Sequence, residues 1–363
     1  MPTLTGITIY PVKSLDGLSL SESLVLPCGA LANDRRWRLV DAEGQVVNAK
    51  RTARFHVIRA GFSLASLTPD WATDGPTAEA DSTGESTGSS ADHPRSGQPR
   101  PDSSQSALNT VTLWLDESTV GNGPPPLAAE TFPLVPGREG PCGWLSEALA
   151  ENVFLEERVE GGFPDDRDAP GPTLISTETL AEVARWFDWD LAEARRRFRM
   201  NLELTGDDPA GTTVGNAGQR AVASLSGPFW EDTLACPARP LPAENNLAAI
   251  NSAAAALAAD PYADLPPPEP QAFSIGDVRF RATGVCRRCV VPSRDSHTAR
   301  VSPLFRDVFE ARRWRGLRAD IDNRGWGSNF CAGICLVGRF CQTTFSQVRT
   351  GHKVAVSFLR DPG

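Results

Sequence analysis

Two cysteines three positions apart, Cys286 and Cys289, are the residues of this chain whose type and spacing point most directly to chemistry. They lie in the segment 286–298, which also holds three arginines, Asp295 and one of four histidines, His297. A thiolate is a soft, strongly donating metal ligand, and cations close to a thiol favour the thiolate form. The segment therefore indicates metal or sulfur chemistry.

The Cys-x-x-Cys spacing is compatible with three kinds of site. Structural zinc needs four ligands, and Cys331 and Cys335 could supply a second pair, although their spacing is irregular. A thioredoxin-like redox pair needs the motif at a helix N-terminus, and the β-branched, proline-containing continuation 290–292 fits that poorly. In the third kind of site, one cysteine ligates a metal and the other is a small packed side chain. The residues alone leave all three open.

Several acidic residues have competing interpretations. Asp295 could orient a ligand or a water molecule through a hydrogen bond, or it could form an Asx turn. Glu231 and Asp232 are adjacent, so on a strand they would face opposite ways and could not act as a carboxylate pair. We therefore expect a structural role for these two, such as pairing with an arginine.

Four arginines occupy the segment 195–199, at the end of a predicted helix. Cations near a helix C-terminus interact favourably with the helix dipole, which accounts for part of this cluster. Four cations exceed that need, so an anion-binding role for at least one of them is the alternative.

Composition limits the classes of function. The 363 residues are 40% hydrophobic with a formal net charge of −9, which allows a substantial core but not the basic surface of a nucleic-acid platform. A small anionic ligand held by local arginines stays compatible with this charge. We see no signal-peptide pattern and no apolar run of about 18 residues, so we expect no membrane span. Eight scattered cysteines favour reduced thiols and a cytoplasmic location.

Hydrophobic periodicity predicts a mainly β fold with some α. Residues 3–60 alternate as short strands separated by turns, as in a small antiparallel barrel or sandwich. The segment 67–107 is dominated by Ser, Thr, Gly, Asp and Pro, and we expect a disordered insertion there. Two helices are predicted, one capped by Ser176 or its neighbour and one by Asp190, and a strand at 273–283 leads into the cysteine motif.

Four stretches, in this order, resemble those of two-domain MOSC-domain proteins, the group that includes the mitochondrial amidoxime-reducing component and its bacterial relatives. They are Tyr-Pro-Val-Lys-Ser at 10–14, Asp-Arg-Arg-Trp at 34–37, Arg-Phe-Arg-Met-Asn at 197–201 and Arg-Cys-Val-Val-Pro-Ser-Arg-Asp at 288–295. The resemblance implies a small N-terminal MOSC β-barrel domain at 1–160. A MOSC-type β-barrel domain with peripheral helices would follow at 161–363, with an Ala- and Pro-rich insertion at 237–271.

The ligand that the resemblance implies is the molybdenum cofactor, a pterin dithiolene with a phosphate tail. Cys289 matches the thiolate that would ligate molybdenum, with Cys286 in an accessory place and Asp295 as a second catalytic candidate. The positions implied for cofactor binding are Lys13, Ser14 and Arg35 near the phosphate, Arg199 and Asn201 at the pterin, and Ser176 as a further contact.

The activity that the resemblance implies is reduction of small N-hydroxylated molecules. Electrons would come from a separate donor, such as a ferredoxin or a flavoprotein reductase, and nucleic acid is not expected as a partner. One alternative is a sulfur carrier or transfer module in which Cys289 holds a persulfide and no molybdenum binds. Another is a protein that stores the cofactor without turnover.

Overall fold

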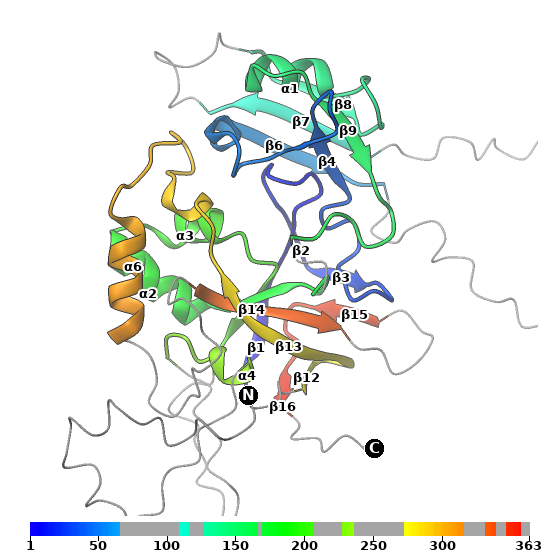
Figure 1. Ribbon diagram of the computed structural model, residues 1–363. Coiled ribbons are helices and arrows are strands. Elements are labelled where there is room, and N and C mark those ends of the chain that lie inside the picture. Colours follow the sequence, from blue (N-terminus) through cyan, green and yellow to red (C-terminus); the bar gives the residue numbers. More distant parts are fainter. Residues whose placement is uncertain are drawn as a thin grey trace, which may run out of the picture.

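The computed structural model describes residues 1–65, 109–116, 127–165, 169–206, 227–235, 272–315, 331–338 and 346–356. These ranges are mainly β-strand with a smaller share of helix, which confirms the predicted fold class (Figure 1). The insertions expected at 67–107 and 237–271 lie outside the described residues. Within the described part of the chain, we find no helix with the length and apolar character that crossing a membrane requires.

The largest sheet has eight strands in the order β16-β12-β13-β14-β10-β11-β1-β2. In chain order they are β1 (Thr3–Ile9), β2 (Leu18–Leu20), β10 (Thr173–Ser176), β11 (Leu202–Thr205), β12 (Ala272–Ile275), β13 (Val278–Arg287), β14 (Cys331–Gly338) and β16 (Val354–Val356). Every neighbouring pair is antiparallel except β10 and β11, which run parallel. Parallel neighbours need a crossover connection, and two helices between these strands provide it.

The main sheet buries a core that is shared by distant parts of the sequence. Leu4, Ile7 and Ile9 of β1 pack in one cluster with Leu174 of β10. A register shift between Leu4 and Gly6 changes which alternate positions face inward, so that both Leu4 and Ile7 are buried. The first strand of the chain therefore belongs to the same sheet as strands formed much later.

A second core lies between two three-stranded sheets and a helix (Figure 1). The elements are β4 (Trp37–Val40), β5 (Val46–Val47) and β9 (Phe154–Glu157) in one sheet, β6 (Ile58–Ser63), β7 (Thr110–Leu115) and β8 (Glu130–Pro133) in the other, and α1 (Cys142–Leu149) with the short 3-10 helix η1 (Ala53–Val57). A separate two-stranded sheet pairs β3 (Glu22–Val25) with β15 (Ser346–Arg349). The domain boundary at residue 160 stays a prediction.

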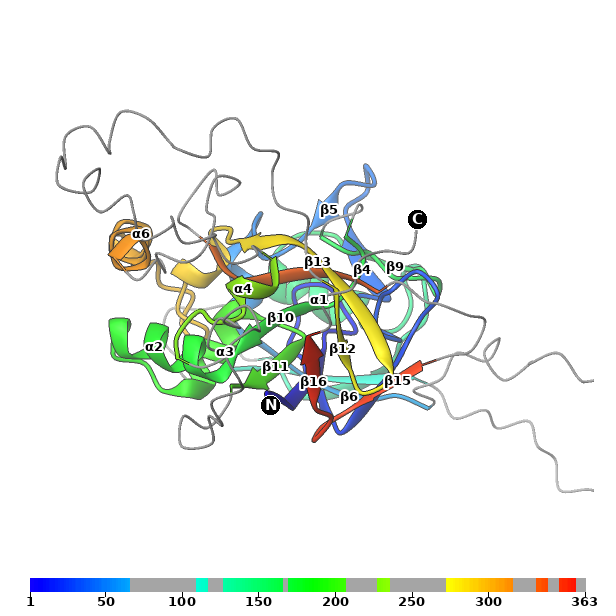
Figure 2. The same cartoon turned by 90° about the horizontal axis from the view of Figure 1, so that it is seen from below.

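Three helices gather at one side of the main sheet (Figure 2). They are α2 (Thr177–Phe187), α3 (Leu191–Phe198) and α6 (Phe305–Arg315), and two shorter elements are α4 (Asp232–Ala235) and the 3-10 helix η6 (Val291–Ser293). Aromatic rings join the three long helices, with Trp186 of α2 5.4 Å and Phe198 of α3 6.1 Å from Phe309 of α6. These contacts fix the end of α3, which supplies the arginine cluster.

Both predicted helix caps are confirmed. The Ser176 hydroxyl accepts a hydrogen bond from the backbone N of Thr179 at 3.1 Å and begins α2. The Asp190 carboxylate accepts one from the backbone N of Glu193 at 2.6 Å and begins α3. Each cap satisfies one of the backbone donors that a helix leaves unpaired at its N-terminus.

The adjacent carboxylates lie at the start of α4 and not on a strand. Asp232 pairs with Arg313, and these side chains are 2% and 1% exposed, so the expected arginine pairing is confirmed for Asp232. Glu231 is buried, and its Oε2 accepts hydrogen bonds from the hydroxyls of Ser176 at 2.7 Å and Thr179 at 2.9 Å. Burial, together with the neighbouring Asp232, raises the pKa of Glu231 to about 7.

Replacing Asp232 by alanine should destabilise the protein by about 3–5 kcal/mol, because it removes a carboxylate that pairs with the buried Arg313 guanidinium. Urea unfolding measures the change. The exposed pair of Arg185 with Glu182 is the matched control, and Arg185→Ala should change the free energy of unfolding little. Equal effects of the two substitutions would contradict the role assigned to Asp232.

Glu231 should make the protein less stable as the pH rises from about 4.5 to about 7. The folded state keeps the Glu231 proton over this range and the unfolded state releases it, so folding is favoured at the acidic end and the advantage is lost at the neutral end. Urea unfolding across this range, compared with Glu231→Gln, isolates the contribution. An unchanged pH slope in the glutamine variant would show that another group is responsible.

Candidate functional site

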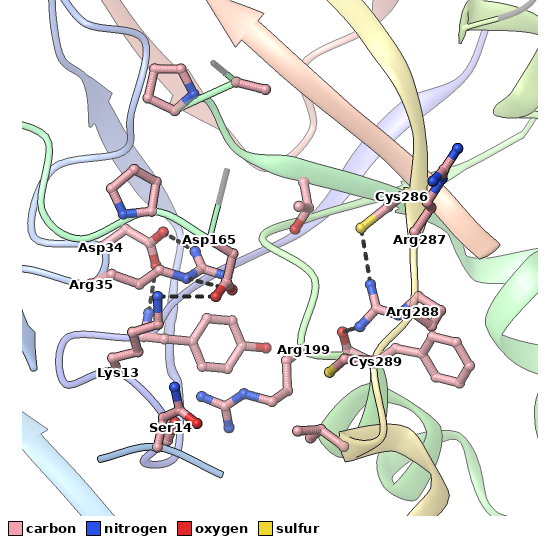
Figure 3. Close-up of a pocket in the computed structure, with 18 of the residues that line it drawn as sticks. Lys13, Ser14, Asp34, Arg35, Asp165, Arg199, Cys286, Arg287, Arg288 and Cys289 are labelled. Atoms are coloured by element: carbon pink, nitrogen blue, oxygen red, sulfur yellow. Dashed lines mark hydrogen bonds and ion pairs between the residues drawn. The ribbon is translucent and has the colours of Figure 1, made fainter. Parts of the chain in front are cut away.

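A pocket of about 670 Å³ is assembled from widely separated parts of the chain (Figure 3). Its lining comes from six segments, within residues 10–14, 30–35, 48–50, 161–173, 197–199 and 283–291. The first lies between β1 and β2, and the last contains the end of β13 and the cysteine motif. Only the folded chain brings these segments together.

The pocket lining carries an excess of positive charge. Among the lining residues that the structure describes, seven side chains are cationic and two are carboxylates. The cations are Lys13, Arg35, Lys50, Arg197, Arg199, Arg287 and Arg288, and the carboxylates are Asp34 and Asp165. In a chain with a formal net charge of −9, such a local excess favours an anionic ligand.

Five residues named for the cofactor line this pocket, namely Lys13, Ser14, Arg35, Arg199 and Cys289. Figure 3 shows Lys13, Ser14 and Arg35 on one side of the pocket and Cys289 on the other, with Arg199 between them. Residues far apart in the sequence are therefore arranged as two ends of one cavity, a cationic end and a thiol end.

The cationic end is built around a carboxylate (Figure 3). Lys13 Nζ lies 3.0 Å from Asp165 Oδ1, and Arg35 Nε lies 3.7 Å from Asp165 Oδ2. Arg35 also pairs with Asp34. Burial lowers the pKa of Lys13. Partial burial of the half-exposed Asp165 side chain raises its pKa, but Arg35 and Lys13 outweigh this effect and hold the pKa well below its ordinary value.

Three pocket residues adopt the left-handed backbone conformation although none is glycine. The φ angles are 79° for Ser14, 50° for Arg35 and 51° for Arg199. This conformation costs an ordinary residue roughly 1–2 kcal/mol, and such costs concentrate at ligand sites. At Ser14 the hydroxyl accepts a hydrogen bond from the backbone N of Ala49 at 3.0 Å, which helps to hold the turn.

Three of the four clustered arginines are held by carboxylates. The pairs are Arg195 with Glu203 at 2.7 Å, Arg196 with Glu193 at 3.1 Å, and Arg197 with both Glu193 at 2.5 Å and Asp295 at 3.0 Å. Local pairing therefore accounts for most of the cluster that the sequence presents.

Arg199 is the exception. Its guanidinium lies over the Tyr10 ring, 4.2 Å from the centroid, and donates to the carbonyl of Leu15 at 2.5 Å. Among the described residues, no carboxylate lies within ion-pair distance of it. Burial lowers the pKa of Arg199, which is the mark of a cation that would gain from an anionic neighbour. Of the four arginines, Arg199 is the one best suited to bind an anion.

The two thiols of the motif differ in their surroundings. Cys286 is 9% exposed, and its Sγ lies 3.1 Å from Arg288 Nη1. The same guanidinium contacts Met200 Sδ at 3.2 Å and the carbonyl of Phe198. Cys289 is partly exposed and lines the pocket. The Arg288 guanidinium is thus engaged by Cys286, Met200 and Phe198. Cys289 is the more accessible of the two thiols for a ligand.

The surroundings of the motif bear on the three kinds of site. Cys286 belongs to the end of β13 and Cys289 precedes η6, so neither begins an α-helix as a thioredoxin-like pair would. The side chains of Cys331 and Cys335 lie outside the described residues. Among the residues that are described, no group of three or more His, Cys, Asp or Glu side chains is arranged to hold a metal ion.

Asp295 does not line the pocket. Its Oδ1 accepts hydrogen bonds from the backbone N of His297 at 3.1 Å and of Thr298 at 2.8 Å, which is the Asx-turn arrangement. Its Oδ2 accepts from Arg197, which does line the pocket. Asp295 therefore forms the Asx turn that was one of its two interpretations, and it contacts the pocket lining through Arg197. Its catalytic role stays a prediction.

Asn201 and Ser176 are not among the residues that line this pocket, and their contact with the cofactor stays a prediction. Asn201 is 1% exposed, and its Oδ1 accepts from the backbone N of Thr173 at 3.1 Å and from Arg35 Nη1 at 3.4 Å. Ser176 is fully buried and committed to Glu231 and the α2 cap. Asn201 thus contacts the pocket lining through Arg35, and the Ser176 hydroxyl is engaged by Glu231 and by the α2 cap.

Sequence reasoning did not assign several lining residues to the site, among them Tyr10, Asp34, Lys50 and Asp165. Tyr10 and Asp34 lie in the stretches that carry the MOSC resemblance, and Asp34 Oδ1 accepts from the backbone N of Tyr10 at 2.8 Å. Burial raises the pKa of Tyr10 to about 12, so its hydroxyl stays protonated. Lys50 and Asp165 belong to no motif, and only the three-dimensional contacts identify them.

Residues 1–108 match the family model described as the MOSC N-terminal beta barrel domain, so this part of the chain is similar to that domain. The matched range contains Lys13, Ser14 and Arg35. No curated protein sequence matches the chain. The MOSC family is associated with the molybdenum cofactor. This association, at the level of the family, agrees with a pocket that offers a thiol and several cations.

The two thiols of the pocket should react with iodoacetamide at different rates. Cys289 is partly exposed and should be alkylated several-fold faster than Cys286, which is buried against Arg288. Peptide mass spectrometry after timed quenching reports each thiol separately. Exposed Cys28 and buried Cys142 give the upper and lower limits, and faster labelling of Cys286 than of Cys289 would reverse the assignment.

Proposed function

We propose that this MOSC-domain protein binds the molybdenum cofactor in the pocket and reduces small N-hydroxylated compounds with electrons from a separate donor, such as a ferredoxin or a flavoprotein reductase. The observation that carries the proposal is the pairing of one accessible thiol, Cys289, with a cationic end across the same cavity. A soft thiolate suits molybdenum, and cations suit a phosphate tail.

The residues present fit the chemical parts of this cofactor. Cys289 would ligate the metal, and Lys13, Ser14 and Arg35 would hold the phosphate tail. Arg199, stacked on Tyr10, would donate to the pterin. A pocket of about 670 Å³ has the size of sites that take small-molecule cofactors.

When bound, the group would supply two-electron redox chemistry with exchange of an oxygen atom. The protein's part would be to hold and orient. The Arg199 guanidinium is fixed by the Leu15 carbonyl and the Tyr10 ring before any ligand arrives, which lowers the entropy lost on binding. The protonated Tyr10 hydroxyl adds no negative charge to the pocket.

Two of the remaining predicted residues would act as positioning residues. Asn201 accepts from Arg35 and so would hold that guanidinium toward the phosphate. Asp295 and Glu193 hold Arg197 at the pocket wall. Outer partners of this kind fix the side chains that touch a cofactor.

A second candidate is a sulfur carrier or transfer module, in which Cys289 holds a persulfide. The observation that favours it is that Cys286 lines the same pocket, with Arg288 beside its sulfur. Cations next to a thiol favour its anionic, nucleophilic form. Release of thiocyanate on treatment with cyanide detects sulfane sulfur and separates this function from the first.

Full-length protein purified from a host that makes the cofactor should contain molybdenum near one atom per chain, because Cys289 supplies the soft ligand and the cations retain the phosphate tail. Elemental analysis and pterin fluorescence after oxidation measure the two parts of the group. Cys289→Ser should lose molybdenum or alter its coordination.

The matched control is Cys142→Ser, since that thiol is buried in the second core and donates to the carbonyl of Gly137 at 3.2 Å, a bond that a serine keeps. It should retain wild-type molybdenum. Wild-type protein without molybdenum and pterin, despite a competent host, would refute the proposal, and sulfane sulfur on Cys289 would then support the sulfur carrier.

A further inference from the structure

One carboxylate already occupies the cationic end of the pocket. Asp165 Oδ1 lies 3.0 Å from Lys13 Nζ and 3.9 Å from Lys50 Nζ, and its Oδ2 lies 3.7 Å from Arg35 Nε. Three cations thus converge on Asp165 (Figure 3 shows two of them), and one of the three, Arg35, is also paired with Asp34. Such a cage matches the charge of a small anion, and here the chain itself supplies that anion.

Asp165 satisfies these cations unequally. Only the contact with Lys13 has the length of a good charge-assisted hydrogen bond, while those with Arg35 and Lys50 are near the limit for an ion pair. The Asp165 side chain is also 53% exposed, so water competes for it. A group that offers more charge and more acceptor oxygens would serve the same three cations better.

The backbone before Asp165 is firmly attached. Gly161 and Gly162 have φ angles of 71° and 59°, and a Cβ at Gly162 would clash with the carbonyl oxygen of Asp34. The backbone N of Phe163 donates to the carbonyl of Arg35 at 2.8 Å. Among the described residues, these anchors reach Phe163, two residues before Asp165, and they do not involve the Asp165 side chain.

We propose that Asp165 is a displaceable internal counter-ion, and that the phosphate monoester dianion of an entering ligand replaces it on Lys13, Arg35 and Lys50. This inference rests on the proposed function in taking these cations as the phosphate site. A monoester carries nearly two charges at neutral pH and three acceptor oxygens, against one charge and two oxygens for the carboxylate. Displaced Asp165 turns to water, where a carboxylate is well solvated.

The exchange gives Asp165 a role in selectivity. A weakly held monoanion such as chloride has no advantage over the tethered carboxylate, whereas a dianion does. Asp165 would therefore keep the pocket closed to common monoanions and reserve it for ligands with a terminal phosphate. It would also keep the three cations compensated in the empty protein.

Calorimetric titration of the full-length, cofactor-free protein with inorganic phosphate tests the exchange. Asp165→Asn keeps the side-chain shape and removes the competing charge, so phosphate should bind about tenfold more tightly than to the wild type. Glu160→Gln is the matched control, because it removes one negative charge from the same segment at an exposed position. It should leave phosphate affinity at the wild-type value.

Adding Lys13→Gln to the Asp165→Asn variant should weaken phosphate binding again, which locates the phosphate at the cage. The proposal would be overturned if the wild type, Asp165→Asn and Glu160→Gln bound phosphate with equal affinity. It would also be overturned if both single variants bound phosphate more tightly to the same extent, or if none of the proteins bound phosphate. Any of these results, with molybdenum content unchanged by Asp165→Asn, would leave the proposed function intact. Absence of molybdenum from wild-type protein made in a competent host would instead refute the proposed function.

Discussion

Burying a cation requires a partner, and the partners available decide which positive charges are left for a ligand. Arg313 has Asp232, Arg197 has Glu193 and Asp295, and Arg35 has Asp34. Positive charge also affects a neighbouring histidine. Burial, together with the nearby Arg294 and Arg199 guanidinium groups, lowers the pKa of His56 to about 4. Arg199 differs from these paired arginines because its guanidinium is stacked on the Tyr10 ring, which leaves it able to bind an anion.

Topology explains why the pocket collects residues from such distant positions. β1 lies in the main sheet beside β11, and the segment that follows β1 carries Lys13 and Ser14. The register of β13 shifts between Val285 and Arg287, immediately before Cys289. Irregularities of this kind turn side chains out of the regular alternation, and here they occur where the strand delivers its thiols.

Local patterns predicted the parts of the structure that local chemistry determines. The helix caps at Ser176 and Asp190 follow from side-chain oxygens placed before amphipathic segments, and both are present. The meeting of Lys13 and Arg199 with Cys289 was expected only through the resemblance of short stretches to a known family. No periodicity or spacing in the sequence implies that these residues share a cavity.

Other features depend on tertiary contacts that the sequence does not display. Ser176 matches a position expected to touch the cofactor, but its hydroxyl points to the buried Glu231. Asp165 belongs to no recognisable pattern, because its importance comes from three cations brought to it by other segments. The sequence places four arginines together, and only their contacts show that three are already neutralised.

The left-handed conformations of Ser14, Arg35 and Arg199 set a limit on how this protein could be made more robust. Glycine adopts such angles without steric cost, so substitution at these positions is an obvious route to a more stable fold. Each replacement would also delete a hydroxyl or a guanidinium from the cavity wall. Thermal stability and ligand recognition therefore place opposite demands on the same three residues. A chain selected only for thermal stability would be expected to lose these pocket side chains.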